Sequence, residues 1–147
     1  MCPHLVFIRS NKPKYARISE TEFMRILREF DPRLESCGLD EANLDVTDYL
    51  EKNGMNSYEG RMFLGQMIRK TIKEQMLMSC SVGIACNKML AKICSELDKP
   101  NGQTYLSFEE EKVLEFMSER KTRAVPGIGS VQEQLLTGLD ISMCGQI

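Results

Sequence analysis

The sequence predicts one domain of the α/β or α+β class, with helices packed on one face of a sheet and a small helical appendix at the end. Its composition is that of a globular protein, with 147 residues of which 42% are hydrophobic and 27% charged. Segments with strand and helix patterns alternate until about residue 120. The remainder changes character and contains a proline-glycine turn and short helical patterns.

Composition excludes several classes of protein. Wholesale disorder and collagen-like structure do not agree with the hydrophobic content. No run approaches the ~18 apolar residues of a membrane span, and no signal-peptide pattern opens the chain. We therefore expect a protein that is neither membrane-bound nor secreted. The formal net charge of −2 argues, at first sight, against a protein that binds nucleic acid.

The cysteines indicate a reducing compartment and argue against a metal-thiolate site. No C-x-x-C pair occurs and the single histidine is His4, whereas zinc needs about four Cys or His ligands, usually in closely spaced pairs. We therefore expect the thiols to be small buried hydrophobic groups. They are Cys2, Cys37, Cys80, Cys86, Cys94 and Cys144.

The near-zero total charge conceals segregation along the chain. Residues 1–30 carry a net charge of +3, residues 31–60 of −6, residues 61–104 of +4 and residues 105–147 of −3. An acidic block between two basic ones agrees with a metal centre lined by a phosphate-binding surface. Solvated helix faces explain the same pattern, and on charge alone they are the better explanation.

The first third of the chain predicts a strand and a helix. Residues 4–8 form a short apolar run typical of a strand. Ser19-x-x-Glu22 is a capping box, in which each side chain satisfies the other's free backbone N–H, and Pro32 ends the helix that starts there. Apolar residues recur at helical spacing at Phe23, Ile26, Leu27 and Phe30.

Two short strands are predicted next, over residues 34–39 and 44–46, with the acids Asp40 and Glu41 between them. Hard cations such as Mg²⁺ take oxygen ligands, usually one or two carboxylates together with substrate phosphates, so this pair is a candidate metal site. In a two-metal site the ions stabilise both the attacking and the leaving oxygen of a phosphoryl transfer. Exposed acids at a turn are the commoner explanation of such a pair.

The middle of the chain predicts a longer helix over about 58–77, followed by a buried strand over 79–86. The inner face of this helix repeats every four residues, at Leu64, Ile68, Ile72 and Met76. Asn87 is the N-cap of a second helix over 88–97. The residues that we expect this second helix to bury are Met89, Leu90, Ile93, Cys94 and Leu97.

Lys92 is the second candidate functional residue. It lies four residues after Lys88 near the start of helix 88–97, on the face opposite the apolar one. A cation there can bind a phosphate that the helix dipole also attracts. A pair of solvated lysines is the commoner explanation.

The third candidate is the turn Gly127-Ile128-Gly129. It follows a turn at 99–103, a strand at 104–106 and a helix over 108–119 that a capping box at Ser107-x-x-Glu110 starts. A third capping box, Ser130-x-x-Glu133, starts a short helix directly after the turn. Glycines let backbone N–H groups approach a phosphate, as in a helix-hairpin-helix that holds the DNA backbone. An ordinary turn between helices is equally compatible.

Taken in order, these features resemble one family. GLDEANLD at 38–45 resembles the S-[IL]-D-E-A-Y-L-[DN] motif of the Y-family translesion DNA polymerases, and SVGIACNKMLAK at 81–92 is similar to their S-x-G-I-A-x-N-[KT]-x-L-A-K segment. KPNGQ at 99–103 and VPGIG at 125–129 are also similar to segments of that family. The variant M-L-A-K-[IV]-C-S-x-x-x-K-P-N-G-Q is most similar to the kappa and DinB branch.

The resemblance implies an α+β polymerase palm with a small helical thumb that contains a helix-hairpin-helix turn. Residues 1–18 would be the end of the fingers, 19–120 the palm and 121–147 a partial thumb. The activity would be DNA-directed nucleotidyl transfer from a dNTP to a primer 3′-hydroxyl during bypass of DNA damage. Its partners would be primer-template DNA and dNTP, in the nucleus of a eukaryote or the cytoplasm of a prokaryote.

The resemblance also implies roles for the candidate residues. Asp40 and Glu41 match two of the three catalytic carboxylates that hold two Mg²⁺ ions. Lys92 matches the palm lysine that contacts the triphosphate of the incoming nucleotide. Gly127 and Gly129 match the thumb hairpin that grips DNA phosphates. Binding regions for a sliding clamp or for other polymerase partners have no match in this sequence.

The departures from the family pattern leave alternatives open. The first catalytic aspartate, the steric-gate aromatic residue and the fingers residues that clamp the triphosphate have no match, and Gly38 and Asn43 replace the motif's serine and tyrosine. We therefore expect the chain alone to lack normal polymerase activity and to be marginally stable. The alternative to an incomplete polymerase is a non-catalytic palm-thumb piece that binds DNA or a protein partner. An unrelated α/β domain with accidental motifs is the least favoured explanation.

Overall fold

The computed structural model of the chain describes residues 4, 6 and 8–147, which divide into two compact units, one up to Tyr49 and one from Leu50 onward. The first unit contains a helical stretch and a β-hairpin. The second contains a pair of parallel strands, the helices that flank them and a group of short helices. No helix within the described residues is long and apolar enough to cross a membrane. The predicted strand at 4–8 includes Leu5 and Phe7, which lie outside the described residues.

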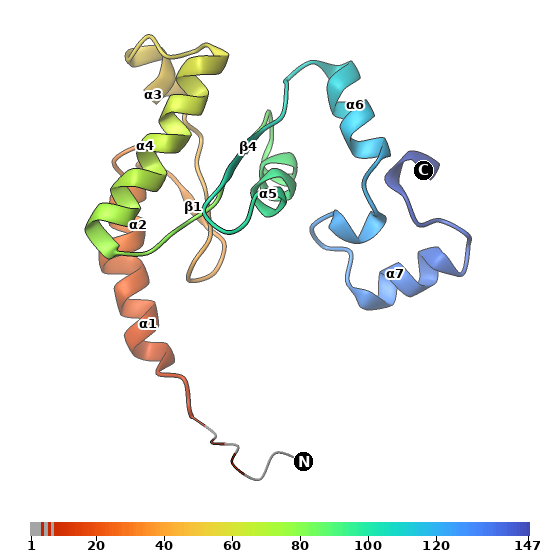
Figure 1. The fold of residues 1–147 in the computed structure, drawn as a ribbon, viewed down its shortest axis with the longest axis horizontal. Coiled ribbons are helices and arrows are strands. Elements are labelled where there is room, and N and C mark those ends of the chain that lie inside the picture. Colours follow the sequence, from red (N-terminus) through yellow and green to blue (C-terminus); the bar gives the residue numbers. More distant parts are fainter. Residues whose placement is uncertain (1–3, 5, 7) are drawn as a thin grey trace. The chain divides into compact units, whose positions relative to one another are not determined.

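One helical stretch runs through much of the first unit (Figure 1). Its parts are α1 (Lys12–Ile18), the π-helical η1 (Ser19–Phe23) and α2 (Met24–Leu27). The stretch is capped by Asn11, whose side-chain oxygen accepts a hydrogen bond of 3.1 Å from the N–H of Lys14. The predicted start at a Ser19 capping box is therefore wrong. Ser19 is only 5% exposed inside the helix, and its hydroxyl donates to the carbonyl of Leu39.

The hydrophobic core of the first unit lies along α2. Its buried side chains are Met24, Ile26, Leu27 and Phe30. Met24 is buried and Phe23 only half-buried because the π-helical turn, which has a wider spacing than an α-helix, shifts the buried face by one residue. The ring of Phe30 lies 5.5 Å from the ring of Tyr49, which extends the core beyond the end of α2.

An antiparallel hairpin completes the first unit. Its strands are β1 (Glu35–Ser36) and β2 (Ala42–Asn43). The predicted strand at 34–39 is therefore shorter than expected, and the one at 44–46 is wrong. Residues 44–46 leave the strand because Asp45 initiates a helix: its carboxylate accepts hydrogen bonds from the N–H (3.1 Å) and the hydroxyl (2.7 Å) of Thr47. This helix, α3 (Thr47–Lys52), was not predicted.

The longest helix of the second unit is α4 (Tyr58–Met76), and it confirms the prediction over 58–77 within one residue. The hydroxyl of Ser57 accepts a hydrogen bond of 3.1 Å from the N–H of Gly60, and the helix ends at Leu77 with φ at 57°. Three of the four predicted inner residues are buried, namely Leu64, Ile68 and Ile72.

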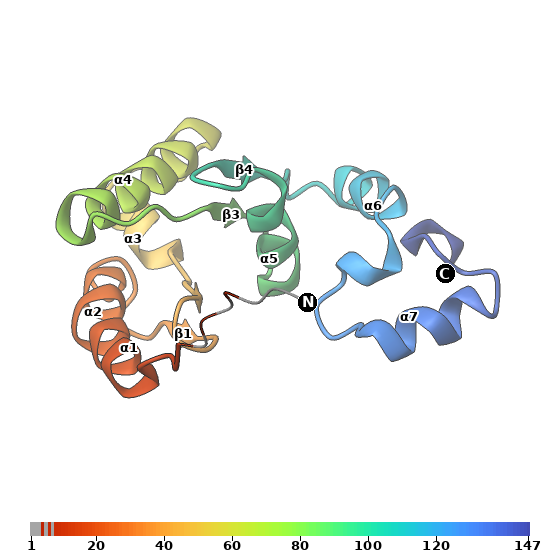
Figure 2. The ribbon, with the colours of Figure 1, turned by 60° about the horizontal axis from the view of Figure 1, so that its bottom comes forward.

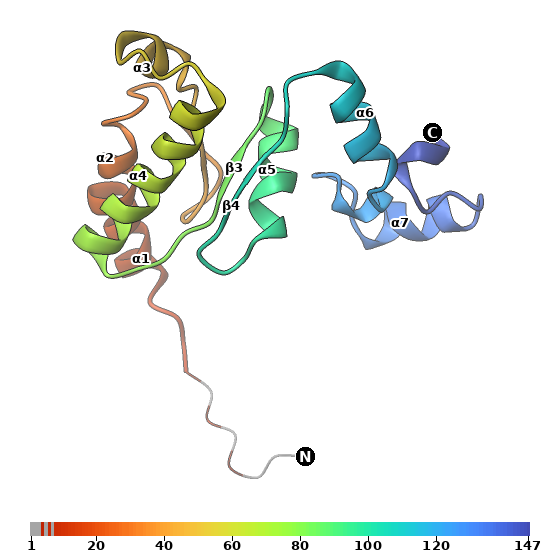
Figure 3. The same cartoon turned by 45° about the horizontal axis from the view of Figure 1, so that its top comes forward.

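Two parallel strands lie side by side between α4 and the helix α5 (Figure 3). The elements are β3 (Val82–Ile84), α5 (Lys88–Leu97) and β4 (Gln103–Tyr105). The predicted bounds of α5 and its N-cap are confirmed: Asn87 accepts a hydrogen bond of 2.9 Å from the N–H of Leu90. The predicted strands at 79–86 and 104–106 are confirmed in position. The strand β3 is shorter than predicted, and β4 is shifted by one residue.

The two faces of the β3–β4 pair are covered by different helices. A Cβ added to Gly83 would lie 1.9 Å from the carbonyl oxygen of Ala91 in α5, so this face packs directly on α5. The next residue, Ile84, points the other way and would lie 3.2 Å from a Cβ at Gly65 in α4. The expectation that helices cover only one face is wrong for this pair, because both faces carry small or apolar residues.

The core of the second unit includes a cluster around α5. Its buried members are Leu90, Cys94 and Leu106, and Val113, Phe116 and Met117 of α6 (Glu110–Ser118) pack on it. Met89 and Leu97, which we expected to be buried, are 41% and 47% exposed. The predicted capping box at Ser107 is also wrong, because α6 begins at Glu110 and the Ser107 hydroxyl accepts from the N–H of Glu109 at 3.3 Å.

The end of the chain forms a helical group with α6 (Figures 1 and 2). Its elements are η2 (Thr122–Ala124), α7 (Ser130–Thr137) and η3 (Cys144–Gln146). Thr122 is 2% exposed, and its N–H donates to the carbonyl of Ser142 at 2.9 Å, which ties the start of the group to its end. The helix α7 begins at Ser130 with Gly129 as its N-cap, so the third predicted capping box is wrong as well.

The cysteines differ in exposure. Cys94 is fully buried, as expected, and burial raises the pKa of its thiol to about 11. Cys37 and Cys86 are exposed, which contradicts the expectation for them. Cys2 lies outside the described residues.

Candidate active site

The loop of the β1–β2 hairpin carries Asp40 and Glu41. The N–H of Cys37 donates to the carbonyl of Glu41 at 2.8 Å and closes the loop, while Gly38 adopts a φ of 97°, which suits a glycine. Asp40 is exposed and Glu41 is half-buried. The structure therefore presents two neighbouring carboxylates, as predicted, although on a tight loop and not between two longer strands.

Tyr15 of α1 interacts with the first of these carboxylates. Burial, then the charge of Asp40, and then a hydrogen bond to the Asp40 carboxylate raise the pKa of Tyr15. The phenol therefore stays protonated at neutral pH and can donate to Asp40.

Another carboxylate of the first unit, that of Asp31, is buried and is held by backbone N–H groups. Its two oxygens accept hydrogen bonds of 2.9 Å each, one from the N–H of Arg33 and one from the N–H of Asp45. Asp31 is 5% exposed, so both oxygens are used within the protein. It joins the turn after α2 to the segment that follows β2.

The donor set of the hairpin agrees with the protein's share of a magnesium site. Asp40 and Glu41 offer carboxylate oxygens, which hard cations prefer. Across the part of the chain that the structure describes, no group of three or more His, Cys, Asp or Glu residues is placed to enclose a metal. Two carboxylates are nevertheless what Mg²⁺ commonly takes from a protein when substrate phosphates and water supply the other ligands.

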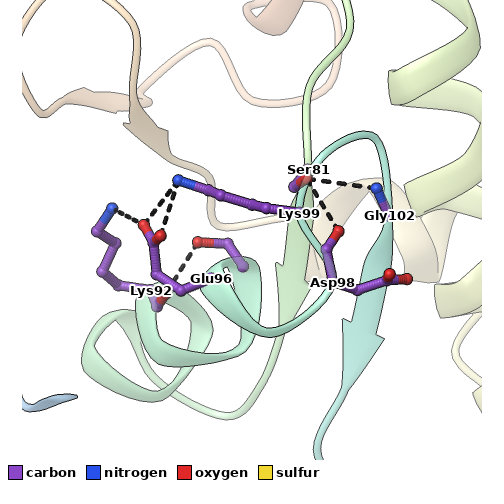
Figure 4. A network of polar contacts seen from close by, with 7 residues as sticks. Ser81, Lys92, Glu96, Asp98, Lys99 and Gly102 are labelled. Atoms are coloured by element: carbon purple, nitrogen blue, oxygen red, sulfur yellow. Dashed lines mark hydrogen bonds and ion pairs between the residues drawn. The ribbon is translucent and has the colours of Figure 1, made fainter.

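Lys92 lies in a network of ion pairs on α5 (Figure 4). Its ammonium group is 2.6 Å from Oε1 of Glu96, and the ammonium of Lys99 is 2.8 Å from Oε2 of the same carboxylate. Hydrogen bonds from Lys92 and Lys99 lower the pKa of Glu96. The side chains of Lys92 and Glu96 are 34% and 46% exposed, so water screens the pair and an external anion can compete for the lysine.

The same figure shows how the turn after α5 is held (Figure 4). The hydroxyl of Ser81 donates to the carbonyl of Asp98 at 3.2 Å and accepts from the N–H of Gly102 at 3.3 Å. A Cβ at Gly102 would lie 2.1 Å from the carbonyl oxygen of Asp98, so the turn requires a glycine there. This network fixes the end of α5 against β3 and β4.

A groove of about 790 Å³ runs between α5 and the segment 119–127. Lys92 and Glu96 line one wall and Gly127 lines the other. Its further charged residues are Glu119, Arg120, Lys121 and Arg123. Four cations against two carboxylates make this groove suitable for an anionic ligand. The structure thus brings together Lys92 and Gly127, whereas Asp40 and Glu41 belong to the first unit.

The glycine turn lies directly before α7, which begins at Ser130. Gly127 adopts a φ of 97° with no atom within 4 Å of a Cβ position, so its backbone is open on that side. Arg123 donates to the carbonyl of Ile128 and lies 3.5 Å from Glu133 of α7, which holds the turn against the helix. The N–H of Gly129 donates to the side chain of Gln132 at 3.1 Å.

The family model described as impB/mucB/samB matches residues 1–96, which include the hairpin, β3 and almost all of α5. The chain belongs to the impB/mucB/samB family. The resemblance to Y-family polymerases is thereby confirmed, and a solved Y-family DNA polymerase chimera is similar to the chain with a TM-score of 0.80 and 32% identity, covering 96% of this chain and 39% of that one.

Curated relatives carry polymerase names. The chain is 33% identical to DNA polymerase kappa of Arabidopsis thaliana, covering all of this chain and 21% of the relative. It is 39% identical to DNA polymerase IV of Dehalococcoides mccartyi, covering all of this chain and 36% of the relative. The crystal structure of DinB from Sulfolobus solfataricus is similar with a TM-score of 0.80 and 33% identity over 94% of this chain and 38% of that one. The chain therefore spans well under half the length of these relatives.

Sequence reasoning did not identify three residues that support the candidate site. Ser19 was interpreted as a helix cap, Asp31 was not singled out, and Glu96 was not seen as the partner of Lys92. The i, i+4 spacing of Lys92 and Glu96 was a signal for that pair. The roles of Ser19 and Asp31 depend on residues that are distant in sequence, so no local pattern indicated them.

Proposed function

We propose that this chain is the palm, with the beginning of the thumb, of a kappa- or DinB-type translesion DNA polymerase. One observation carries the proposal. The chain belongs to the impB/mucB/samB family, and its β1–β2 hairpin presents Asp40 and Glu41 together on a closed loop. The reaction is the attack of a primer 3′-hydroxyl on the α-phosphate of a dNTP, with release of pyrophosphate, opposite damaged template bases. Residues 19–120 form the palm, and residues 121–147 begin the thumb.

Asp40 and Glu41 are the residues that hold Mg²⁺ in this proposal. When bound, two such ions stabilise the attacking and leaving oxygens of the transferred phosphoryl group. The loop contributes rigidity, because the Cys37–Glu41 hydrogen bond and the turn at Gly38 fix where the two carboxylates lie. Tyr15 of α1 keeps its proton beside Asp40 and can donate a hydrogen bond to that carboxylate.

Lys92 binds the triphosphate of the incoming nucleotide in this proposal. Its contact with Glu96 is at the surface, so exchange of a carboxylate for a more highly charged phosphate costs little. Gly127 and Gly129 belong to a helix-hairpin-helix between η2 and α7 that holds DNA phosphates without reading bases. Arg120, Lys121 and Arg123 supply positive charge beside it. Because its substrate is DNA, the protein works in the nucleus of a eukaryote or the cytoplasm of a prokaryote.

The test is a primer-extension assay on a chimaera. Residues 9–147 replace the matching segment of the Sulfolobus solfataricus DinB protein, to which they are similar over most of their length. We expect template-directed incorporation with Mg²⁺, and we expect Asp40→Asn or Glu41→Gln to lower its rate by roughly 10²–10³-fold. Incorporation that both substitutions leave unchanged would refute the proposal. If the chimaera binds primer-template DNA with a steep salt dependence but never incorporates, the non-catalytic DNA-binding role is the correct one.

A further inference from the structure

The hairpin that carries Asp40 and Glu41 is too short to hold itself in place. Its ladder consists of two residue pairs, Glu35 with Asn43 and Ser36 with Ala42. An isolated two-stranded hairpin is at best marginally stable in water. Something else in the first unit must therefore fix the position of the loop.

Two buried polar side chains, one in the helical stretch and one in the turn after α2, contact the hairpin at its two ends. We propose that Ser19 and Asp31 are positioning residues for the Asp40–Glu41 pair: Ser19 holds the carbonyl of Leu39, and Asp31 holds the N–H of Asp45. The expected effect on metal binding rests on the proposed function, whereas the two hydrogen bonds to the hairpin do not depend on that function.

Ser19 fixes the peptide unit directly before the first carboxylate. Its hydroxyl donates to the carbonyl of Leu39, which belongs to the same planar peptide group as the N–H of Asp40. Fixing that plane limits where the Cα of Asp40 can lie. Ser19 is 5% exposed, and a buried hydroxyl is costly unless it is hydrogen-bonded, so the contact is strongly favoured.

The helix is locally distorted at this residue. The π-helical η1 begins at Ser19, and such turns are rare and occur frequently at functional sites. The hydroxyl of Thr21, in the same turn, donates a hydrogen bond of 2.9 Å to the carbonyl of Arg17 within the helix. Ser19 is thus the hydroxyl of η1 that reaches the hairpin, and Thr21 is a matched control residue.

Asp31 fixes the other end of the hairpin. It accepts from the N–H of Asp45, two residues after β2, and from the N–H of Arg33 in the turn after α2. Hydrogen bonds from backbone N–H groups to a carboxylate are stronger than those to a neutral acceptor. Because both bonds are 2.9 Å long and Asp31 is 5% exposed, the carboxylate joins the turn after α2 to the chain after β2.

The test measures the hairpin and its metal affinity in the 147-residue chain. Amide hydrogen exchange is followed by NMR at Cys37, whose N–H closes the loop, and at Asp45, whose N–H binds Asp31. Binding of Mn²⁺ is followed through the paramagnetic broadening of residues 39–42. The variants are Ser19→Ala, Ser19→Thr, Asp31→Asn and the control Thr21→Ala, with Asp40→Asn/Glu41→Gln as the binding control.

We expect Ser19→Ala and Asp31→Asn to accelerate exchange at the two amides and to weaken Mn²⁺ binding by roughly tenfold, the usual effect of losing a partner that orients metal ligands. Ser19→Thr should restore both, because it retains the hydroxyl, and Thr21→Ala should resemble wild type. If Ser19→Ala does not fold, Ser19→Cys keeps the volume with a weaker donor and should give an intermediate loss.

Two results would overturn the inference. One is wild-type exchange and Mn²⁺ affinity in both Ser19→Ala and Asp31→Asn. The other is an equal loss in Thr21→Ala, which would indicate general destabilisation of the helix. If the wild-type chain does not bind Mn²⁺ at the hairpin, the metal-binding role of Asp40 and Glu41 fails, and the exchange rates at Cys37 and Asp45 alone decide whether Ser19 and Asp31 position the loop.

Discussion

Replacing Glu96 by glutamine should increase the affinity of the chain for a triphosphate. In the structure the Glu96 carboxylate is 2.6 Å from Lys92 and 2.8 Å from Lys99, so it neutralises Lys92, the cation that we propose for phosphate binding. The substitution Glu96→Gln keeps the shape of the side chain and removes its charge. It therefore weakens the hold of residue 96 on Lys92 and also removes a negative charge that repels the ligand.

The expected gain follows from the exposure of the pair. The side chains of Lys92 and Glu96 are 34% and 46% exposed, so the interaction is that of a surface ion pair, worth about 0.2–1 kcal/mol. Releasing it should tighten triphosphate binding by at most about 1 kcal/mol, which is about fivefold in Kd. The cost in the free energy of unfolding should be about 0.3–0.5 kcal/mol, the usual value for an i, i+4 pair.

The assay is a titration of the ¹⁵N-labelled chain with sodium tripolyphosphate, followed at the amides of α5. Glu115→Gln is a matched control, because Glu115 pairs with Lys112 at 3.0 Å on α6 outside the groove. We expect tighter binding in Glu96→Gln, wild-type binding in Glu115→Gln and weaker binding in Lys92→Ala. Weaker binding in Glu96→Gln, or an equal gain in Glu115→Gln, would refute the reasoning.

The same carboxylate predicts a pH dependence of stability. Because Lys92 and Lys99 lower the pKa of Glu96, its contribution is fully present above the pKa of an unfolded glutamate and is lost as the pH falls through the lower folded value. The Glu96→Gln variant should therefore lose less stability than wild type on acidification through that window. Thermal unfolding at a series of pH values measures this, and identical acid dependence in the two proteins would contradict it.

Three further predictions concern the packing of the second unit. Gly83→Ala should destabilise it by about 3 kcal/mol or more, because the added Cβ would lie 1.9 Å from a backbone oxygen of α5, whereas Gly138→Ala should be nearly neutral; thermal melts compare the two. Leu90→Ala should cost about 2–5 kcal/mol in urea unfolding, since Leu90 is 1% exposed, and a loss below about 1 kcal/mol would contradict the described core. Cys94 should react with iodoacetamide far more slowly than the exposed Cys37, because burial raises the pKa of its thiol to about 11, and equal rates by mass spectrometry would contradict that burial.

Much of the second unit could be predicted from sequence because its signals are local. The four-residue repeat at Leu64, Ile68 and Ile72 and the cap at Asn87 each depend on residues within two helical turns. These patterns are enough to place α4 and α5 to within a residue. The opposite placement of the two helices about β3 could not be predicted, because it depends on contacts of Gly83 and Ile84 with residues distant in sequence.

The capping boxes show the limit of such local patterns. Ser19 satisfies the sequence pattern, yet an earlier cap at Asn11 starts the helix and leaves the Ser19 hydroxyl available for Leu39. The helix after Ser107 begins three residues later, at Glu110, and the helix α7 has Ser130 itself as its first residue. At Ser19 an earlier cap and a tertiary contact together outweigh a preference worth about 1 kcal/mol.

The candidate site could be predicted only in part for the same reason. Asp40, Glu41, Lys92 and the glycine turn belong to contiguous motifs that are recognisable in sequence. The partners that orient or neutralise them lie elsewhere in the chain, as Ser19 does for the loop. The groove beside Lys92 likewise exists because segment 119–127 packs near α5, which no motif encodes.

The most direct test of the polymerase assignment is the rate of single-nucleotide incorporation by the chimaera with the Sulfolobus solfataricus DinB protein, measured with saturating primer-template DNA and Mg²⁺. Glu35→Gln, on the first strand of the same hairpin, is the control for charge and hairpin integrity. If Asp40 holds the metal, Asp40→Asn should lower the rate constant by roughly 10²–10³-fold, equivalent to the several kcal/mol that a correctly held ion supplies, while Glu35→Gln stays near the unsubstituted rate. Equal rates for Asp40→Asn and Glu35→Gln would contradict the assignment.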